Sequence, residues 1–161
     1  FLQITQCTPH VEYYIQMDYK VGIWKMKLHF KVDADNFLLA GEASGQVKKT
    51  LKQLGIPAQT IRRLAISMYE AEINMVIHAR GGEIDVEITP EKVYAILRDT
   101  GPGIPDIELA MEEGYTTASH KVRELGFGAG MGLPNMKKYS DDLIVTSEVG
   151  KGTTVEIVVL L

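Results

Sequence analysis

The sequence predicts a two-layer α/β sandwich of the α+β kind, with a mixed, mostly antiparallel sheet and helices on one face. Three observations predict it. Two helical patterns follow each other directly, short turns join the predicted strands in pairs, and no repeat or linker divides the chain. Tight turns favour antiparallel neighbours, whereas alternating strands and helices favour a parallel sheet. A doubly wound Rossmann fold is therefore not expected.

The chain opens with predicted strands. Residues 1–25 carry aromatic side chains on both sides of a turn-forming segment, which is typical of a strand or hairpin (Tyr13, Tyr14, Tyr19 and Trp24 around Lys20–Gly22). The next strand has apolar residues at every second position, a period-2 pattern (Met26, Leu28, Phe30 and Val32). We interpret residues 1–25 as an N-terminal extension and residues 26–161 as the main domain.

Two helices are predicted to follow this strand. Asp33 or Asp35 can cap the first helix, which runs to about Leu54 and ends at a glycine. Pro57 suits the first turn of the second helix, which runs to about Arg80 before two glycines. Because the two helices are consecutive, we expect them to cover the same face of the sheet.

The rest of the chain predicts two pairs of strands separated by a long loop. Residues 84–88 and 93–97 form the first pair across a turn at residues 89–91. From residue 99 to residue 132 no periodicity is visible, and a stretch of this length in a compact domain is usually functional. A short helix at residues 133–139 and strands at residues 143–146 and 154–160 complete the chain.

The composition excludes several functional classes. The 161 residues suit one globular domain, and the net charge of −4 argues against nucleic acid as the main partner. The single cysteine, Cys7, cannot form an internal disulfide, which favours a reducing cytoplasm. No apolar run could span a bilayer and no signal peptide is visible, so we expect a cytoplasmic protein that does not bind membranes.

One face of the second predicted helix carries polar residues in an apolar setting. Glu70, Asn74 and His78 are spaced four residues apart and therefore form a stripe along the helix. A partly buried carboxylate and amide need partners, because an unpaired buried polar group costs about 1–3 kcal/mol. The stripe could satisfy local backbone groups, or it could bind a ligand.

Two glycine-containing segments provide further candidate sites. Asp99 follows a predicted strand, and Gly101 and Gly103 would let the backbone turn sharply beside it. An aspartate there could accept a hydrogen bond from an exocyclic amine such as that of adenine, although Asp, Gly and Pro also form plain turns. Residues 126–132 place four glycines at alternate positions before a helix, which is the form of a phosphate cradle.

Taken together, these motifs resemble the GHKL ATP-binding proteins. The chain has Glu-x-x-x-Asn on a helix, Asp-x-Gly-x-Gly after a strand, a long loop, a Gly-x-Gly-x-Gly run and a late Gly-Thr. The resemblance covers about residues 26–160. It is nearest to the anti-sigma-factor serine/threonine kinases, which resemble histidine-kinase catalytic domains without a dimerisation helix pair.

The resemblance implies a role for each matching residue. It implies that Asn74 binds Mg²⁺, that Glu70 is the general base, and that Asp99 selects adenine with help from Thr153. It further implies that Gly101 and Gly103 shape the adenine side of the site and that Gly128, Gly130 and Gly132 cradle the phosphates. Lys121, or Arg123 as the alternative, would supply a cation to the γ-phosphate. Residues 104–130 would form a lid over ATP.

The implied function is a Mg²⁺-dependent kinase that transfers the γ-phosphoryl group of ATP to a partner protein. The partner would be a sigma factor or an anti-anti-sigma-type substrate, and a homodimer is also considered. Two alternatives stay open at this point. The chain could be an ATP-gated binding switch without phosphotransfer, or a stand-alone histidine-kinase-type catalytic domain.

Overall fold

The structure is a computed structural model that describes residues 5–8, 11–18, 23–33 and 39–161. Groups of strands and groups of helices follow each other along the chain, without a regular strand–helix alternation. They are β1 (Thr5–Thr8), β2 (Val11–Asp18), β3 (Ile23–Asp33), α1 (Glu42–Gln53), α2 (Ala58–His78), β4 (Gly81–Ile88), β5 (Lys92–Arg98), α3 (Ile107–Ala110), α4 (His120–Glu124), α5 (Gly132–Tyr139), β6 (Asp142–Glu148) and β7 (Gly152–Leu160).

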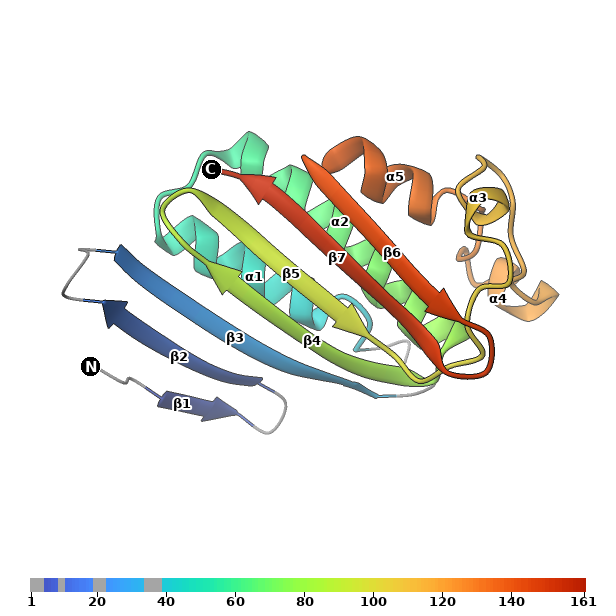
Figure 1. Cartoon of the computed structure of the whole chain (residues 1–161), viewed down its shortest axis with the longest axis horizontal. Helices are drawn as coiled ribbons and strands as arrows, with labels where there is room; N and C mark the ends of the chain where they lie inside the picture. Colours follow the sequence, from blue (N-terminus) through green and yellow to red (C-terminus); the bar gives the residue numbers. More distant parts are fainter. Residues whose placement is uncertain (1–4, 9–10, 19–22, 34–38) are drawn as a thin grey trace.

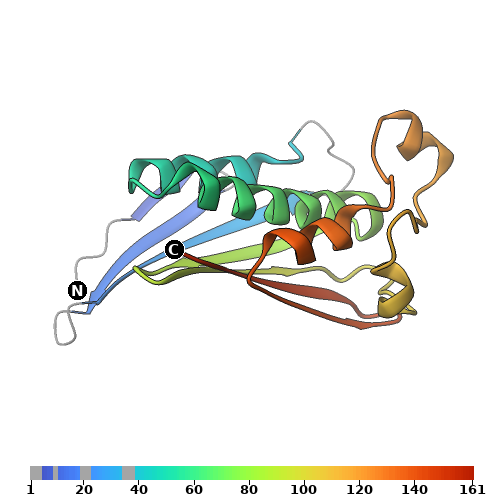
Figure 2. The same ribbon diagram turned by 90° about the horizontal axis from the view of Figure 1, so that it is seen from above.

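The strands form a seven-stranded sheet in the order β1-β2-β3-β4-β5-β7-β6. Helices α1, α2 and α5 cover one face of this sheet, as Figures 1 and 2 show. The predicted two-layer sandwich is therefore confirmed. The expectation of a mixed sheet is wrong, because every described strand pair is antiparallel. The chain crosses from β5 to the outer edge of the sheet, where it forms β6. It then turns back as β7, which lies between β5 and β6 and runs antiparallel to both.

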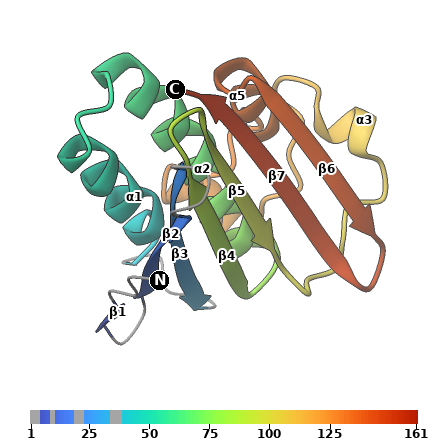
Figure 3. The same ribbon diagram turned by 60° about the vertical axis from the view of Figure 1, so that its left-hand side comes forward.

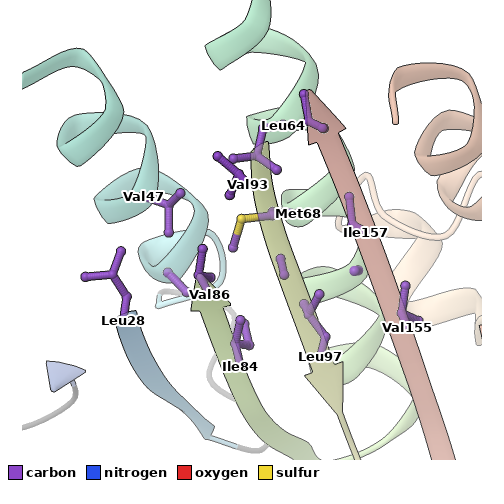
Figure 4. Packing of buried hydrophobic residues seen from close by; sticks show 14 of the residues in the cluster. Leu28, Val47, Leu64, Met68, Ile84, Val86, Val93, Leu97, Val155 and Ile157 are labelled. Atoms are coloured by element: carbon purple, nitrogen blue, oxygen red, sulfur yellow. The ribbon is translucent and has the colours of Figure 1, made fainter. Parts of the chain in front are cut away.

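The core lies between the sheet and the helices. Alternate residues of the central strands point toward the helices, and Ile84, Val86 and Leu97 are at most 2% exposed. Leu64 and Met68 of α2 pack against them, and Figure 4 shows these side chains converging from both layers. Each Å² of buried apolar surface stabilises this packing by about 25 cal/mol. The packing holds α2 on the sheet and thereby fixes the position of its polar stripe.

The N-terminal strands continue the same sheet. β2 pairs with β3 along its whole length, from Val11 opposite Phe30 to Asp18 opposite Ile23. The turn predicted at Lys20–Gly22 lies outside the described residues. β3 begins before the boundary expected at residue 25, so the division into an extension and a domain stays a prediction based on the sequence pattern.

Helix α1 begins later than predicted. Asp33 is the last residue of β3 and pairs with Gly81, so it does not cap the helix, and Asp35 lies outside the described residues. The helix begins at Glu42, and the buried carboxylate of Glu72 on α2 accepts hydrogen bonds from three backbone N–H groups at 3.0–3.1 Å (Gly41, Ala43 and Ser44). An acceptor from another helix therefore performs the capping that the sequence assigned to an aspartate.

Replacing Glu72 by alanine is expected to lower the free energy of unfolding by about 2 kcal/mol, because the N–H groups at the start of α1 lose their common acceptor. Urea denaturation measures this change. Glu42→Ala is the matched control, because it removes an exposed carboxylate from the first turn of the same helix and should have a much smaller effect. Equal losses in the two variants would contradict the capping role of Glu72.

None of the described helices combines the length and the apolar composition that a membrane span requires.

Candidate functional site

A cleft of about 780 Å³ lies between the C-terminal half of α2, the start of α5 and the segment that joins β5 to α5. This joining segment contains the short helices α3 and α4 and lies at one end of the molecule, where Figure 3 shows α3 on the β6 side of the sheet. The cleft is large enough for a nucleotide. Most of the predicted site residues line it (Glu70, Asn74, Asp99, Gly103, Gly128, Gly130, Gly132 and Thr153).

Helix α2 presents its polar stripe to the cleft because its opposite face is held in the core. Leu64 and Met68 are at most 1% exposed on the core side. Glu70 and Asn74 are half-buried on the cleft side, one turn apart. Within the described residues the Asn74 amide makes no hydrogen bond, so its oxygen is free to bind a ligand.

His78 continues this stripe one turn beyond Asn74. Burial lowers the pKa of His78 below its usual value, while the nearby charge of Asp99 opposes that shift. The imidazole is therefore neutral at physiological pH, and it contributes no fixed positive charge to the cleft.

Asp99 is held rigidly by two backbone hydrogen bonds. Its Oδ1 accepts from the N–H of Gly101 at 2.9 Å and from the N–H of Thr153 at 3.1 Å. A side chain at position 101 would lie 2.6 Å from Cα of Ala79, so only glycine allows this close turn. No hydrogen bond to Oδ2 is present within the described residues, which leaves one carboxylate oxygen available in the cleft.

The glycine run closes the other side of the cleft. Gly130 has φ +75°, and a Cβ there would lie 2.6 Å from the carbonyl oxygen of Tyr115. Helix α5 starts at Gly132, and its N-cap residue Met131 provides no side-chain hydrogen bond. The first N–H groups of α5 are therefore available to an anion, and the helix dipole adds partial positive charge at that point.

The sequence did not predict two polar residues around the site. Asn135 of α5 donates a hydrogen bond from Nδ2 to Oε1 of Glu70 at 2.7 Å. Ser147 lies 2.9 Å from the Thr153 hydroxyl and accepts from the N–H of Ile104 at 2.7 Å. The pairing of Ser147 with Thr153 in the β6–β7 hairpin could have been inferred by counting back from the turn, whereas no sequence signal identifies Asn135.

Two predicted site residues do not line the cleft, and neither does Arg123, the alternative cation. Gly101 packs against Ala79 behind Asp99, so it supports the carboxylate rather than facing a ligand. Lys121 is exposed on α4 and does not reach the cleft in this structure. The segment at residues 104–130, in which the sequence shows no periodicity, contains two short helices, whose N-termini are capped by Asp106 and Ser119.

The arrangement combines three chemical capacities in one cleft. It offers a fixed carboxylate at one wall, an amide and a second carboxylate on α2, and N–H groups at the start of α5 that the N-cap side chain does not cap. These groups suit a ligand that has an exocyclic amine at one end and phosphates at the other. Within the described residues no group of three or more acidic, histidine or cysteine side chains could hold a metal by itself.

The chain is similar to members of a known protein family. Residues 59–161 match the family described as histidine kinase-, DNA gyrase B-, and HSP90-like ATPase. The chain is 30% identical over 113 residues to the serine/threonine-protein kinase RsbT of Bacillus subtilis, which covers 68% of this chain and 79% of that protein. It is also similar to anti-sigma F factors, at 33% identity in Geobacillus stearothermophilus (81% and 88% covered) and 32% in Clostridium beijerinckii (83% and 92% covered).

Proposed function

Because this chain belongs to the family of histidine kinase-, DNA gyrase B-, and HSP90-like ATPases, we propose that it is an anti-sigma-type protein kinase. In this proposal it transfers the γ-phosphoryl group of ATP to a serine or threonine of a partner protein. The observation that carries the proposal is the position of Glu70, one helical turn before Asn74 in the cleft that also contains Asp99. A carboxylate beside the phosphate end of the nucleotide can serve as a general base.

Asp99 would bind the adenine. Its free Oδ2 can accept a hydrogen bond from the N6 amine, whereas the carbonyl of guanine would place two acceptors against each other. The backbone N–H of Thr153 donates to this carboxylate, and the Thr153 hydroxyl lies 2.9 Å from that of Ser147. Thr153 and Gly103 both line the cleft. We propose that these groups hold the base directly or through water.

Asn74 would hold Mg²⁺ together with the phosphates. Its amide oxygen is available in the cleft, and Mg²⁺ is commonly bound by one or two protein oxygens, substrate phosphates and water. The donor set therefore fits this ion. When bound, Mg²⁺ would neutralise phosphate charge. Gly128, Gly130 and Gly132 would cradle the phosphates with the N-terminus of α5, and Lys121 would reach them only after the segment at residues 104–130 closes.

Glu70 would act directly in the transfer. The acceptor hydroxyl oxygen attacks the γ-phosphorus while the hydroxyl proton passes to a carboxylate oxygen of Glu70. The bond from the γ-phosphorus to the β–γ bridging oxygen breaks, and ADP leaves with that oxygen. In a transfer of this kind the protein contributes mainly positioning and charge stabilisation.

The proposal extends to the partner and the compartment. The name anti-sigma F factor, which several similar proteins carry, supports a sigma factor as the partner. An anti-anti-sigma-type substrate is the other partner that we propose. The absence of cysteine pairs and the kinase function support a cytoplasmic location. A homodimer stays a prediction, and light scattering of the purified protein tests it.

A label-transfer assay tests the function. The purified protein is incubated with Mg²⁺, ATP carrying ³²P in the γ-position and an extract of the source cells. We expect label on a partner protein in acid-stable, alkali-labile form, as phosphoserine or phosphothreonine. Acid-labile label would indicate a histidine acceptor. Partner binding that needs ATP but gives no label would indicate the binding switch and overturn the kinase proposal.

A further inference from the structure

We propose that Asn135 is a positioning residue for Glu70, and that it joins this carboxylate to the helix on which the phosphates would bind. The inference rests on the proposed kinase function, because it concerns the base of that reaction. Asn135 lies outside both the glycine run and the polar stripe of α2, and it does not line the cleft. Its contact with Glu70 is made by the fold alone, because the two residues are 65 positions apart.

The hydrogen bond has a defined direction. Nδ2 of Asn135 lies 2.7 Å from Oε1 of Glu70, and both side chains are half-buried. An ionised carboxylate can only accept, so the amide nitrogen of Asn135 must face it. A hydrogen bond to a charged group is roughly twice as strong as one between neutral groups. This contact therefore restricts the rotation of the Glu70 side chain.

The bond leaves one carboxylate oxygen of Glu70 for chemistry. A Cβ built on Gly132 would lie 3.5 Å from Oε2 of Glu70 and 3.3 Å from Nδ2 of Asn74. Oε2 therefore faces the start of α5 on the same side as the Asn74 amide. Asn135 donates to Oε1, and Oε2 is therefore the oxygen that would take the proton.

Helix α5 makes this contact a link between phosphate binding and the base. Gly132 begins the helix and Asn135 lies three residues later, within the same turn. Any displacement of the start of α5 by bound phosphates also moves the donor that holds Oε1. A general base must lie within hydrogen-bond reach of the proton it removes, so a small change in its orientation changes the rate.

Replacing Asn135 by alanine is expected to lower kcat for label transfer about 10- to 100-fold, with KM and Kd for ATP unchanged. Alanine is the best helix former, so α5 should be retained. Asn135→Asp keeps the shape but replaces the donor by a second carboxylate, and it should be slower than Asn135→Ala. Lys137→Ala, an exposed change on the same helix, is the control and should match the wild type.

A double-mutant cycle separates positioning from general damage to the fold. If Asn135 acts only through Glu70, then adding Asn135→Ala to Glu70→Gln should lower kcat less than twofold further. Equal fold-losses in both backgrounds would overturn the inference. Full activity of Asn135→Ala, with Glu70→Gln strongly impaired, would also overturn it and leave the kinase proposal intact. If the wild type labels no acceptor, the kinase proposal fails first.

A measurement without ATP tests the contact itself. In the nucleotide-free protein, ¹⁵N NMR should show one side-chain amide proton of Asn135 exchanging at least tenfold more slowly with water than those of an exposed asparagine or glutamine. Glu70→Ala should abolish this protection, and Lys137→Ala should leave it unchanged. Protection that persists in Glu70→Ala would show that the acceptor of Asn135 is another group.

Discussion

Replacing Glu70 by glutamine is expected to lower the rate of phosphoryl transfer about 100-fold or more while leaving the affinity for ATP nearly unchanged. Glutamine keeps an oxygen that can accept from Asn135, so the position of the side chain is preserved. It loses the ability to take a proton from the acceptor hydroxyl. A change confined to kcat therefore identifies proton transfer as the lost function.

Two measurements make this prediction specific. Calorimetric titration with ATP and Mg²⁺ shows whether binding is retained, and single-turnover label transfer measures the chemical step. Glu91→Gln is the matched control, because Glu91 is an exposed carboxylate in the turn between β4 and β5 and does not line the cleft. Label transfer at the wild-type rate by Glu70→Gln would exclude Glu70 as the base.

Replacing Asp99 by asparagine is expected to weaken ATP binding about 100-fold or more. The N–H groups of Gly101 and Thr153 donate to the position that Oδ1 occupies, so the asparagine oxygen must take that position. Its NH₂ group then points where Oδ2 was, and it faces the N6 amine of adenine donor to donor. A site built around one hydrogen bond discriminates strongly against a ligand that leaves its polar groups unpaired.

Calorimetry with ATP, ADP and GTP, with and without Mg²⁺, measures this effect. The wild type should bind ATP and ADP but bind GTP far more weakly, and Asp99→Asn should lose that preference. Asp142→Asn, an exposed change outside the cleft, should behave like the wild type. Comparable affinities of the wild type for ATP and GTP would count against the role of Asp99.

Local patterns were sufficient for much of the fold. The period-2 alternation of Leu28 and Phe30 predicted a half-buried strand, and these side chains are 2% exposed. The four-residue spacing of Glu70 and Asn74 predicted a common face of a helix, and both residues line one cleft. Such features are local because the geometry of the backbone fixes the direction of each side chain relative to its neighbours.

Contacts between distant residues decided what the patterns could not show. The first helix was predicted to begin near Asp33 because aspartate is a good cap, but Glu72 supplies the acceptor and the helix begins at Glu42. Nothing in the local sequence marks Glu72 as different from other glutamates. Its role depends on the packing of α2 against α1.

By itself, the sequence determined the two-layer class, the helical stripe and the residue types that a nucleotide site requires. Only the tertiary structure decided the order β5-β7-β6, the oxygen of Asp99 that stays free, and the bond from Asn135 to Glu70. The reason is physical. Periodicity records which side of one element faces the core, whereas a hydrogen bond between elements depends on how the whole core packs.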